Sequence, residues 1–439
     1  MTARRSPREI ELVIDELTED GLGRGRFEDR DVRARNALPG ERVTVRVLQR
    51  RRGIWHGEAQ TPPEPASGRV APVCEYFPRC GGCTLQHLDY RAQLEHKEQV
   101  LRQLLARAGV VPRRWRPPVA GPRLHYRHKA RLGVRVVGDE LLAGFREGFS
   151  SRVTRMEHCA VLAEPFVAAL PQIKRTLAHL SRPDRLPQVE LAGGDREFAM
   201  LLRHLTPLES RDRRLLEALS ERTGLRVFVQ PGGYETVRPL DEQAGRTLRY
   251  SNPDFGLCYR FEPTDFTQVN PYVNRLVVRN ALLALAPKPG TSAVDLFCGI
   301  GNFSLALARL GVRVLGLEAA AGAVARAAEN AAFNGLSGLA EFAVADLYDA
   351  RCPDLPASDY LLLDPPRSGA GPNLARWARA PRLQRIAYVS CGPASFAADA
   401  ARLVALGFEL EEVGVYDMFP HTAHIETLGL FVRRIDRRG

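Results

Sequence analysis

Long hydrophobic runs are missing from this sequence of 439 residues. It holds no apolar stretch of about eighteen residues, the length that a helix needs to cross a membrane. The opening segment MTARRSPREIELVIDELTED also lacks the apolar centre of a secretory signal. We therefore expect a cytoplasmic protein that does not use a membrane, with two or three domains for a chain of this length.

Lysine is also scarce, and arginine takes its place. Only four of the 62 basic residues are lysines, and 51 acidic residues leave a net charge of +11, which fits a polyanionic partner. Genomic composition also shapes arginine content, so the distribution says more than the number. Residues 99–138 hold ten basic residues and no acidic one, with Trp115, His125, Tyr126 and His128 among them as flat faces for base stacking. The stretch could be a solvated basic face, but contact with nucleic acid is the better hypothesis.

Changes of pattern along the chain predict three domains. Residues 1–62 contain β-rich runs, EIELVIDEL and RVTVRVLQ, between the turn signals DGLGRGR and LPGE, which predicts a small β-barrel. A Pro-rich linker (61–72) opens the region 63–265. There a helix is expected over 89–108, ending at Gly109, and it is a candidate to pack on the catalytic domain. The rest of this region mixes strand-like and helical pieces, which indicates an α+β domain of unassigned topology.

The third domain, 266–439, follows a regular pattern. Apolar runs such as SAVDLF, RVLGLE and DYLLLD alternate with helical segments rich in Ala and Leu. Such alternation implies right-handed crossovers and a parallel sheet with helices on both faces. Two further strand-like runs, FELEEVGVYDMF and HIETLGLFVRR, predict a C-terminal hairpin. The predicted fold class is therefore α/β, with a Rossmann-like nucleotide-binding sheet.

The first turn of this sheet is DLFCGIGNF, from Asp295 to Phe303. Glycines after a strand let the backbone approach a ligand beside a helix N-terminus. A dinucleotide fingerprint has a third small residue, Gly or Ala, three positions after the second glycine, where this chain has Ser304–Leu305. The turn therefore favours S-adenosylmethionine over a nicotinamide cofactor.

Acidic residues close the next strands of the same sheet. Glu318 ends RVLGLE, where it could accept hydrogen bonds from both ribose hydroxyls, and Asp346 ends FAVAD, where it could accept one from an adenine amino group. Asp364 ends the fourth strand, in LLLDPPRSG. Each could instead cap the following helix. Because they occur in order after the glycine turn, we expect them to face one cofactor crevice.

A cysteine follows the fifth strand, in the segment YVSCGPAS. Cys391 could be a buried small hydrophobe, but its place at the carboxyl edge suits a nucleophile. Methylation of uracil is one reaction that would use such a thiolate, because C5 of uracil is too weak a nucleophile to take a methyl group unaided. A thiolate that adds to C6 gives C5 carbanion character, and a base must later remove the C5 proton. Among the polar residues of Phe419–Glu426, Glu426 is our candidate for that base.

The cysteines suggest a metal site as well, because eight thiols in a cytoplasmic chain favour metal binding or catalysis over disulfides. Cys74, Cys80 and Cys83 have the spacing C-x5-C-x2-C, and Cys159 lies further along. This is neither the paired C-x2-C pattern of most zinc sites nor the C-x3-C-x2-C pattern of radical S-adenosylmethionine enzymes. The residues alone leave iron–sulfur and zinc open. Three more cysteines have an expected role in packing (258, 298 and 352).

The motifs taken together resemble a known family. QVN at 268–270, DLFCGIGNF, GLE, DPPRSG, YVSCGPAS and DMFPHTAHIET, in this order, are similar to the bacterial RNA 5-methyluridine methyltransferases. The segment DGLGRG with its flanking strands looks like a TRAM domain, a small RNA-binding barrel, so the resemblance spans the chain. Gly392 and Ser395 depart from the family pattern, in which Asn and Thr are often found.

The resemblance implies an S-adenosylmethionine site, with Cys391 as nucleophile and Glu426 as base. It implies cofactor contacts from six residues: Gln268, Phe297, Asn302, Glu318, Asp346 and Asp364. It also implies a [4Fe-4S] cluster that shapes the RNA-binding region, held by Cys74, Cys80, Cys83 and Cys159.

A barrel together with a cluster is similar to the family members that methylate 23S ribosomal RNA, so we expect RNA and not DNA as the partner, and a monomer. A tRNA or dual-site enzyme is the alternative with the same chemistry. An iron–sulfur oxidoreductase is disfavoured by the glycine turn. An RNA-binding protein without activity is disfavoured by Cys391 and Glu426.

Overall fold

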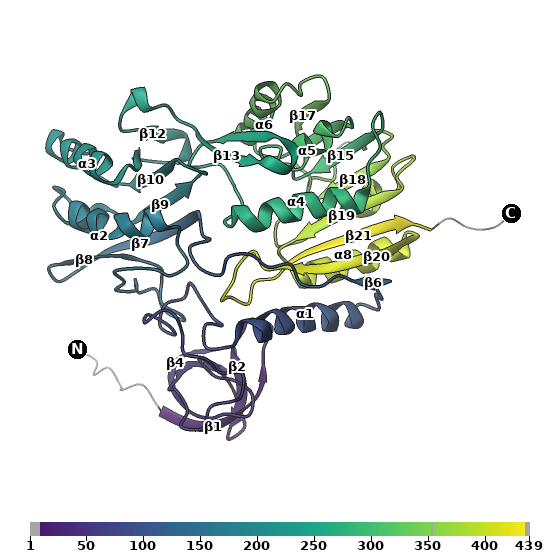
Figure 1. The fold of residues 1–439 in the computed structure, drawn as a ribbon. Helices are drawn as coiled ribbons and strands as arrows, with labels where there is room; N and C mark the ends of the chain where they lie inside the picture. Colours follow the sequence, from purple (N-terminus) through teal and green to yellow (C-terminus); the bar gives the residue numbers. More distant parts are fainter. Residues whose placement is uncertain (1–8, 353, 435–439) are drawn as a thin grey trace.

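The computed structural model describes residues 9–352 and 354–434 (Figure 1). Its first five strands form a closed barrel in the order β1-β2-β3-β5-β4, as predicted. The strands are β1 (Glu9–Leu17), β2 (Gly23–Phe27), β3 (Arg30–Arg35), β4 (Arg42–Arg51) and β5 (Ile54–Ala59). Buried and exposed residues alternate along β1, so its apolar side chains fill the barrel. A Cβ atom at Gly25, in DGLGRG, would lie 2.2 Å from the carbonyl oxygen of Val13, so strand closure requires glycine there.

The central region contains a six-stranded sheet in the order β12-β11-β10-β9-β7-β8. Its strands are β7 (Lys129–Val137), β8 (Glu140–Gly144), β9 (Gln188–Gly193), β10 (Phe198–Arg203), β11 (Arg226–Gln230) and β12 (Arg238–Pro239). Two helices, α2 (Glu164–Ala178) and α3 (Ser210–Thr223), pack on it. A separate hairpin of β13 (Leu248–Asn252) and β14 (Leu257–Phe261) contacts the catalytic domain through α6. Four short 3-10 turns complete the region: Pro183–Arg185, Tyr234–Thr236, Glu242–Ala244 and Pro253–Phe255.

The C-terminal region is built on an eight-stranded sheet in the order β17-β16-β15-β18-β19-β21-β20-β6. Its strands are β15 (Ser292–Leu296), β16 (Arg313–Glu318), β17 (Ala340–Val344), β18 (Tyr360–Leu363), β19 (Arg385–Ser390), β20 (Phe408–Tyr416), β21 (Glu426–Arg433) and the short β6 (Arg114–Trp115). Strands β15 to β19 are parallel, and β21 is antiparallel to both β19 and β20. The α/β sheet and the C-terminal hairpin are therefore confirmed.

The order of these strands marks a ligand site. From β15 the chain builds outward to β16 and β17, and then returns to the other side of β15 with β18 and β19. Ligands bind at the carboxyl ends of the strands where the order reverses in this way, here between β15 and β18. The helices of this region are α4 (Pro271–Leu285), α5 (Ser304–Arg309), α6 (Ala321–Phe333), α7 (Leu374–Trp377) and α8 (Pro393–Ala405).

The predicted helix at 89–108 is α1 (Tyr90–Arg107), which Asp89 caps by accepting a hydrogen bond from the N–H of Arg91 at 2.9 Å. It packs against α8 and β20, and its buried Val100, Leu101 and Leu105 belong to the same apolar core as the catalytic sheet. Figure 1 shows it running from the barrel along the edge of that sheet. In the part of the chain that the structure describes, no helix is both long and apolar enough to span a membrane.

Part of the basic stretch 99–138 also joins the catalytic sheet. Arg113 pairs with Glu409 at 3.0 Å, and Arg116 pairs with Glu412 at 2.9 Å; Arg114 pairs with Glu412 too. These arginines thus fasten β6 to β20.

Candidate active site

The glycine turn after β15 lies at the point where the strand order reverses. Phe297, Gly299 and Gly301 all have positive φ angles, of 63°, 54° and 90°. This conformation is ordinary for glycine and uncommon for phenylalanine, so the surroundings must hold Phe297 in place. Its ring contacts those of Tyr348 and Trp377, with centroids 5.9 and 6.4 Å away. The turn therefore presents backbone and one half-buried aromatic ring at the carboxyl edge.

Two of the predicted acidic residues hold local backbone groups at this edge. Glu318 accepts hydrogen bonds from the N–H of Gly299 at 3.3 Å and from that of Ala320 at 3.0 Å. Asp346 accepts one from the N–H of Tyr348 at 2.9 Å and is exposed. Both residues thus have a structural role, and each carboxylate has further lone pairs to offer a ligand.

The two predicted amide residues lie next to α4. The side chain of Asn302 both donates to and accepts from that of Asn274, at 3.0 and 3.1 Å, which ties the glycine turn to the helix. Gln268 is half-buried, two residues before Asn270 caps α4. The structure thus brings Asn302 to the turn, with its amide already engaged.

Two buried carboxyl groups lie on either side of the reversal: Asp295 within β15, and Asp364 directly after β18. Burial raises the pKa of both Asp295 and Asp364 to about 7, and the negative field of Asp364 adds to the shift at Asp295. Ser304 donates to Oδ2 of Asp295 at 2.5 Å, whereas Oδ1 is buried and has no hydrogen-bond partner among the described residues. Our reading of the sequence missed Asp295, although it opens the DLFCGIGNF motif.

The register of the last strands brings the two predicted catalytic residues together. Ser390 at the end of β19 pairs with Thr427 of the antiparallel β21, so the next residues along, Cys391 and Glu426, meet at the same edge. Burial raises the pKa of the Cys391 thiol to about 11, and the charges of Glu426 and Asp364 add to this. Burial, and then the charge of Asp364, raise the pKa of Glu426 well above its usual value.

A cation that the sequence analysis did not assign opposes these shifts. Arg367, in the DPPRSG motif, lowers the pKa of both Cys391 and Glu426 by its charge, and it also hydrogen-bonds to the thiol. Its guanidinium lies 3.1 Å from Nδ1 of His424. Burial, and then the positive charge of Arg367, lower the pKa of His424 to about 4, so the ring is neutral and accepts from the guanidinium at neutral pH. The site thus combines a thiol, a carboxyl group and a guanidinium.

Gly392 and Ser395, the two departures from the family pattern, lie against the backbone of Arg367. The Ser395 hydroxyl lies 2.9 Å from the carbonyl oxygens of both Arg367 and Gly392. A Cβ atom at position 392 would lie 2.7 Å from the Arg367 carbonyl oxygen, so glycine permits this close approach. Both departures therefore lie against the backbone carbonyl of Arg367.

Comparison with known proteins identifies the family. A family model described as tRNA (Uracil-5-)-methyltransferase matches residues 89–435. The chain belongs to this family.

Two relatives match nearly the whole chain. The 23S rRNA (uracil(1939)-C(5))-methyltransferase RlmD of Acidithiobacillus ferrooxidans is 43% identical over 429 residues, which cover 96% of this chain and 97% of the relative. The protein of the same name from Nitrosococcus oceani is 45% identical over 428 residues, 95% of each chain. The tRNA (uracil-54, C5)-methyltransferase of Pyrococcus abyssi, solved with S-adenosyl-L-homocysteine, shares the fold, with a TM-score of 0.75 and 23% identity over 96% of this chain and 100% of that one.

Four cysteines of this uracil-5-methyltransferase family member line a cavity, and three of them precede the matched residues 89–435. Cys74, Cys80, Cys83 and Cys159 all line one small cavity. Burial raises the pKa of Cys83 to about 12 and that of Cys159 to about 11. Among the described residues, no three His, Cys, Asp or Glu side chains are arranged around a common point as ligands of one metal ion. A [4Fe-4S] cluster does not need that arrangement, because each of its four thiolates binds a different iron.

The cavity wall is shaped around these thiols. The N–H of Gly82 donates to Sγ of Cys80 at 3.5 Å, and hydrogen bonds to cluster sulfurs are typical of iron–sulfur sites. A Cβ atom at Gly81 would lie 2.7 Å from the carbonyl oxygen of Arg146, so the backbone approaches closely there. The barrel residue Arg35 donates to the carbonyl oxygens of Pro78, Cys80 and Cys83, at 2.7, 2.7 and 2.6 Å.

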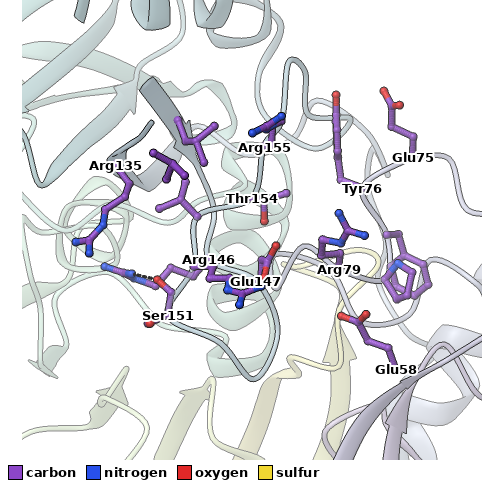
Figure 2. A pocket seen from close by; sticks show the side chains of 16 residues that line it. Glu58, Glu75, Tyr76, Arg79, Arg135, Arg146, Glu147, Ser151, Thr154 and Arg155 are labelled. Atoms are coloured by element: carbon purple, nitrogen blue, oxygen red, sulfur yellow. Dashed lines mark hydrogen bonds between the residues drawn. The ribbon is translucent and has the colours of Figure 1, made fainter. Parts of the chain in front are cut away.

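An arginine-lined hollow of about 970 Å³ lies between the barrel, the cysteine loop (residues 74–83) and the β7–β8 hairpin (Figure 2). Five arginines line it: Arg79, Arg135, Arg146, Arg152 and Arg155. Arg155 pairs with Glu140 at 2.7 Å, and Arg146 donates to the carbonyl oxygen of Ser151. Within the described residues Arg79, Arg135 and Arg152 have no ion-pair partner. Three glutamates also line the hollow, Glu58, Glu75 and Glu147, so the arginines exceed the acidic residues there by two. The three arginines without an ion-pair partner are the ones best placed to contact phosphates.

Proposed function

We propose that this protein is an S-adenosylmethionine-dependent methyltransferase that methylates C5 of a uridine in 23S ribosomal RNA. The observation that carries the proposal is the meeting of Cys391 and Glu426 at the carboxyl edge, one strand from Asp364 and the reversal of strand order. The near-full-length likeness to 23S rRNA (uracil(1939)-C(5))-methyltransferases supports the choice of RNA. The cytoplasmic location and the monomeric state remain predictions.

S-adenosylmethionine, when bound, supplies an electrophilic methyl group. The residues that would hold it are Gln268, Phe297, Asn302, Glu318, Asp346 and Asp364. Two observations support such a ligand: Phe297 and Asp364 directly follow the two strands at the reversal point, and a buried oxygen of Asp295 there lacks a partner among the described residues. Phe297 would pack against the cofactor, while Glu318 and Asp346 would accept from its hydroxyl and amino groups.

The chain's own residues then carry the covalent chemistry. The Cys391 thiolate forms a bond to C6 of uracil, and the C5–C6 electron pair moves toward C5 and the O4 carbonyl. Once C5 carries the methyl group, Glu426 takes the C5 proton. The electrons of that C–H bond restore the double bond, and Cys391 leaves as thiolate. Arg367 favours the thiolate at the start and at the end of this sequence, because its charge lowers the pKa of Cys391.

The four cysteines lining the cavity would hold a [4Fe-4S] cluster with a structural role. A cluster there would tie Cys159 to the segment Cys74–Cys83 and close a long loop in the central region. The hollow beside it, together with the barrel, would bind RNA phosphates. We assign the cluster no part in the methyl transfer.

RNA that carries 5-fluorouridine at the target tests the proposal. Fluorine at C5 cannot leave as a proton, so we expect a covalent protein–RNA adduct that resists denaturation. Cys391→Ala should form none while still binding S-adenosylmethionine. Adduct that persists in Cys391→Ala would move the nucleophile elsewhere. Transfer of methyl groups to tRNA but not to 23S rRNA transcripts would replace the substrate and leave the chemistry intact.

A further inference from the structure

The loop that leads into Glu426, residues 417–425, is held by a distant part of the chain. The N–H groups of Thr84 and Leu85 both donate to the carbonyl oxygen of His421, at 2.9 Å each. In the opposite direction, the N–H of Ala423 donates to Oγ1 of Thr84 at 3.0 Å. Three hydrogen bonds therefore join the segment after Cys83 to the loop before Glu426.

Helix α1 contacts the same loop from another side. The N–H of His421 donates to Oε1 of Gln93 at 3.0 Å. Lys97, fully buried, pairs with Asp417 at 2.6 Å and donates to the carbonyl oxygen of Phe419 at 3.1 Å. These bonds are enclosed, so water does not readily replace them.

A third contact comes from the segment that precedes β7 in the central region. The hydroxyl of Tyr126, which is buried against the core of the central domain, donates to the carbonyl oxygen of Pro420 at 3.1 Å. Three separate elements of residues 84–126 thus bind backbone atoms of one catalytic loop.

The loop needs such support because its backbone is not relaxed. His421 has a φ angle of +64°, in the left-handed region that residues other than glycine adopt only at some cost. Its carbonyl oxygen and its N–H are both bound by the outside contacts, which select this conformation. Glu426 is the first residue of β21, and its backbone is paired with Tyr416 of β20. Relaxation of the loop would therefore act on the orientation of the Glu426 side chain relative to Cys391.

We infer that Thr84 is a positioning residue for the proton-removal step. Thr84 fixes the 417–425 loop through its hydrogen bonds with Ala423 and His421, and so orients the side chain of Glu426. The inference rests on the proposed role of Glu426 as base. It also gives the cysteine loop a consequence for catalysis, since Thr84 directly follows Cys83.

The test is Thr84→Val, which keeps the side-chain shape and removes the acceptor for the N–H of Ala423. With an unmodified 23S rRNA transcript, rapid-quench measurements should show covalent adduct accumulating and product released on the order of ten-fold more slowly. That is part of the contribution expected of a general base. Affinities for RNA and S-adenosylmethionine should match the parent protein. Thr84→Ser, which restores the hydroxyl, should restore release.

A matched control is Thr223→Val. Thr223 also accepts a backbone N–H, from Leu225, but it lies on α3, which packs with α2 and β11 of the central region. It should release product at the parent rate. Tyr126→Phe removes the separate bond to Pro420 and should give the same accumulation of adduct, which keeps the inference testable if Thr84→Val folds poorly.

Glu426→Gln distinguishes failure of the inference from failure of the proposed function. If Glu426→Gln accumulates adduct while Thr84→Val and Tyr126→Phe both release product like the parent, the positioning inference is wrong and the proposed function stands. If Glu426→Gln turns over normally, the base assignment and the inference fail together.

Discussion

The catalytic edge and the cysteine cavity are positioned by different means. At the edge, Asp364, Cys391 and Glu426 each lie at the end of a strand, and the hydrogen-bonded ladders of β18, β19 and β21 set the relative places of their backbones. The four cysteines around the cavity lie outside the named strands and helices, and backbone support there comes from isolated bridges and from side chains such as Arg35. A site on strand ends depends on a core that folds in any case, whereas a loop site depends on a few specific bonds or on a bound group.

The two regions also differ in charge. The edge concentrates carboxyl groups, whose burial raises the pKa of Asp295 and Asp364. The cavity places a buried guanidinium, Arg35, against the carbonyl oxygens of the cysteine loop, and burial lowers the pKa of this group. The carboxyl groups of the edge would suit a positively charged sulfonium. The guanidinium at the cavity would suit a negatively charged cluster with thiolate ligands.

The strongest way to break this comparison is to remove a proposed cluster ligand. Anaerobically purified protein should be brown and hold about four irons per chain. Cys83→Ser should lose most of the iron and become less soluble, and its RNA affinity should fall far more than its affinity for S-adenosylmethionine. Iron analysis, absorption spectra and calorimetric titration measure these properties.

The matched control for that change is Cys352→Ser, a buried cysteine of the catalytic domain. It should keep its iron. Stoichiometric zinc in a colourless anaerobic preparation would rule out the iron–sulfur assignment and leave the methyltransferase proposal in place.

An effect of intermediate size is expected on the pH dependence of the unfolding free energy, through the buried carboxyl groups of the catalytic edge. The folded protein holds the proton of Asp364 more tightly than the unfolded chain does, because its pKa is raised to about 7. The stability that this proton binding contributes is present below about pH 4 and is lost as pH rises through 7, on the order of 1 kcal/mol per pH unit. Asp364→Asn should therefore flatten the fall in unfolding free energy of the ligand-free protein over this range, as measured by urea denaturation.

Asp359, at the opposite end of β18, provides a control of opposite sign. Burial acts to raise its pKa, but hydrogen bonds from the N–H and hydroxyl of Ser292 bring it below the usual value. Asp359→Asn should remove stability that is present above about pH 4 and lost in acid. The same slope in both variants would show that Asp364 does not titrate as described.

The smallest expected effect concerns RNA binding by the hollow. Changing Arg79, Arg135 and Arg152 to Gln should weaken RNA binding and reduce the slope of log affinity against log salt by about 0.7 to 0.9 for each phosphate that the variant no longer binds. The triple change of Arg113, Arg114 and Arg116 is the comparison set, since their ion pairs with Glu409 and Glu412 leave them less free to bind phosphate. Equal slopes for both triples would mean that the hollow has no special part in RNA binding.

Much of the fold follows from short-range patterns in the sequence. Alternating apolar residues predict the strands of the barrel, and the β/α alternation after residue 266 predicts the parallel sheet. The proposed site residues at the ends of strands, such as Glu318, Asp364 and Cys391, could be predicted for the same reason. Topology gathers the carboxyl ends of parallel strands at one edge, so the order along the chain is enough to group them.

The tertiary structure decided what depends on contacts between distant segments. The place of α1 on the catalytic sheet, the guanidinium of Arg367 beside His424, and the bonds from Thr84 to the 417–425 loop have no periodic signal in the sequence. Thr84 and Ala423 are 339 positions apart, and their contact exists because the barrel, the cysteine loop and the last hairpin pack together. Local residue choice sets strands, turns and the chemistry at their ends, whereas the burial of apolar faces against one another decides which of those ends meet.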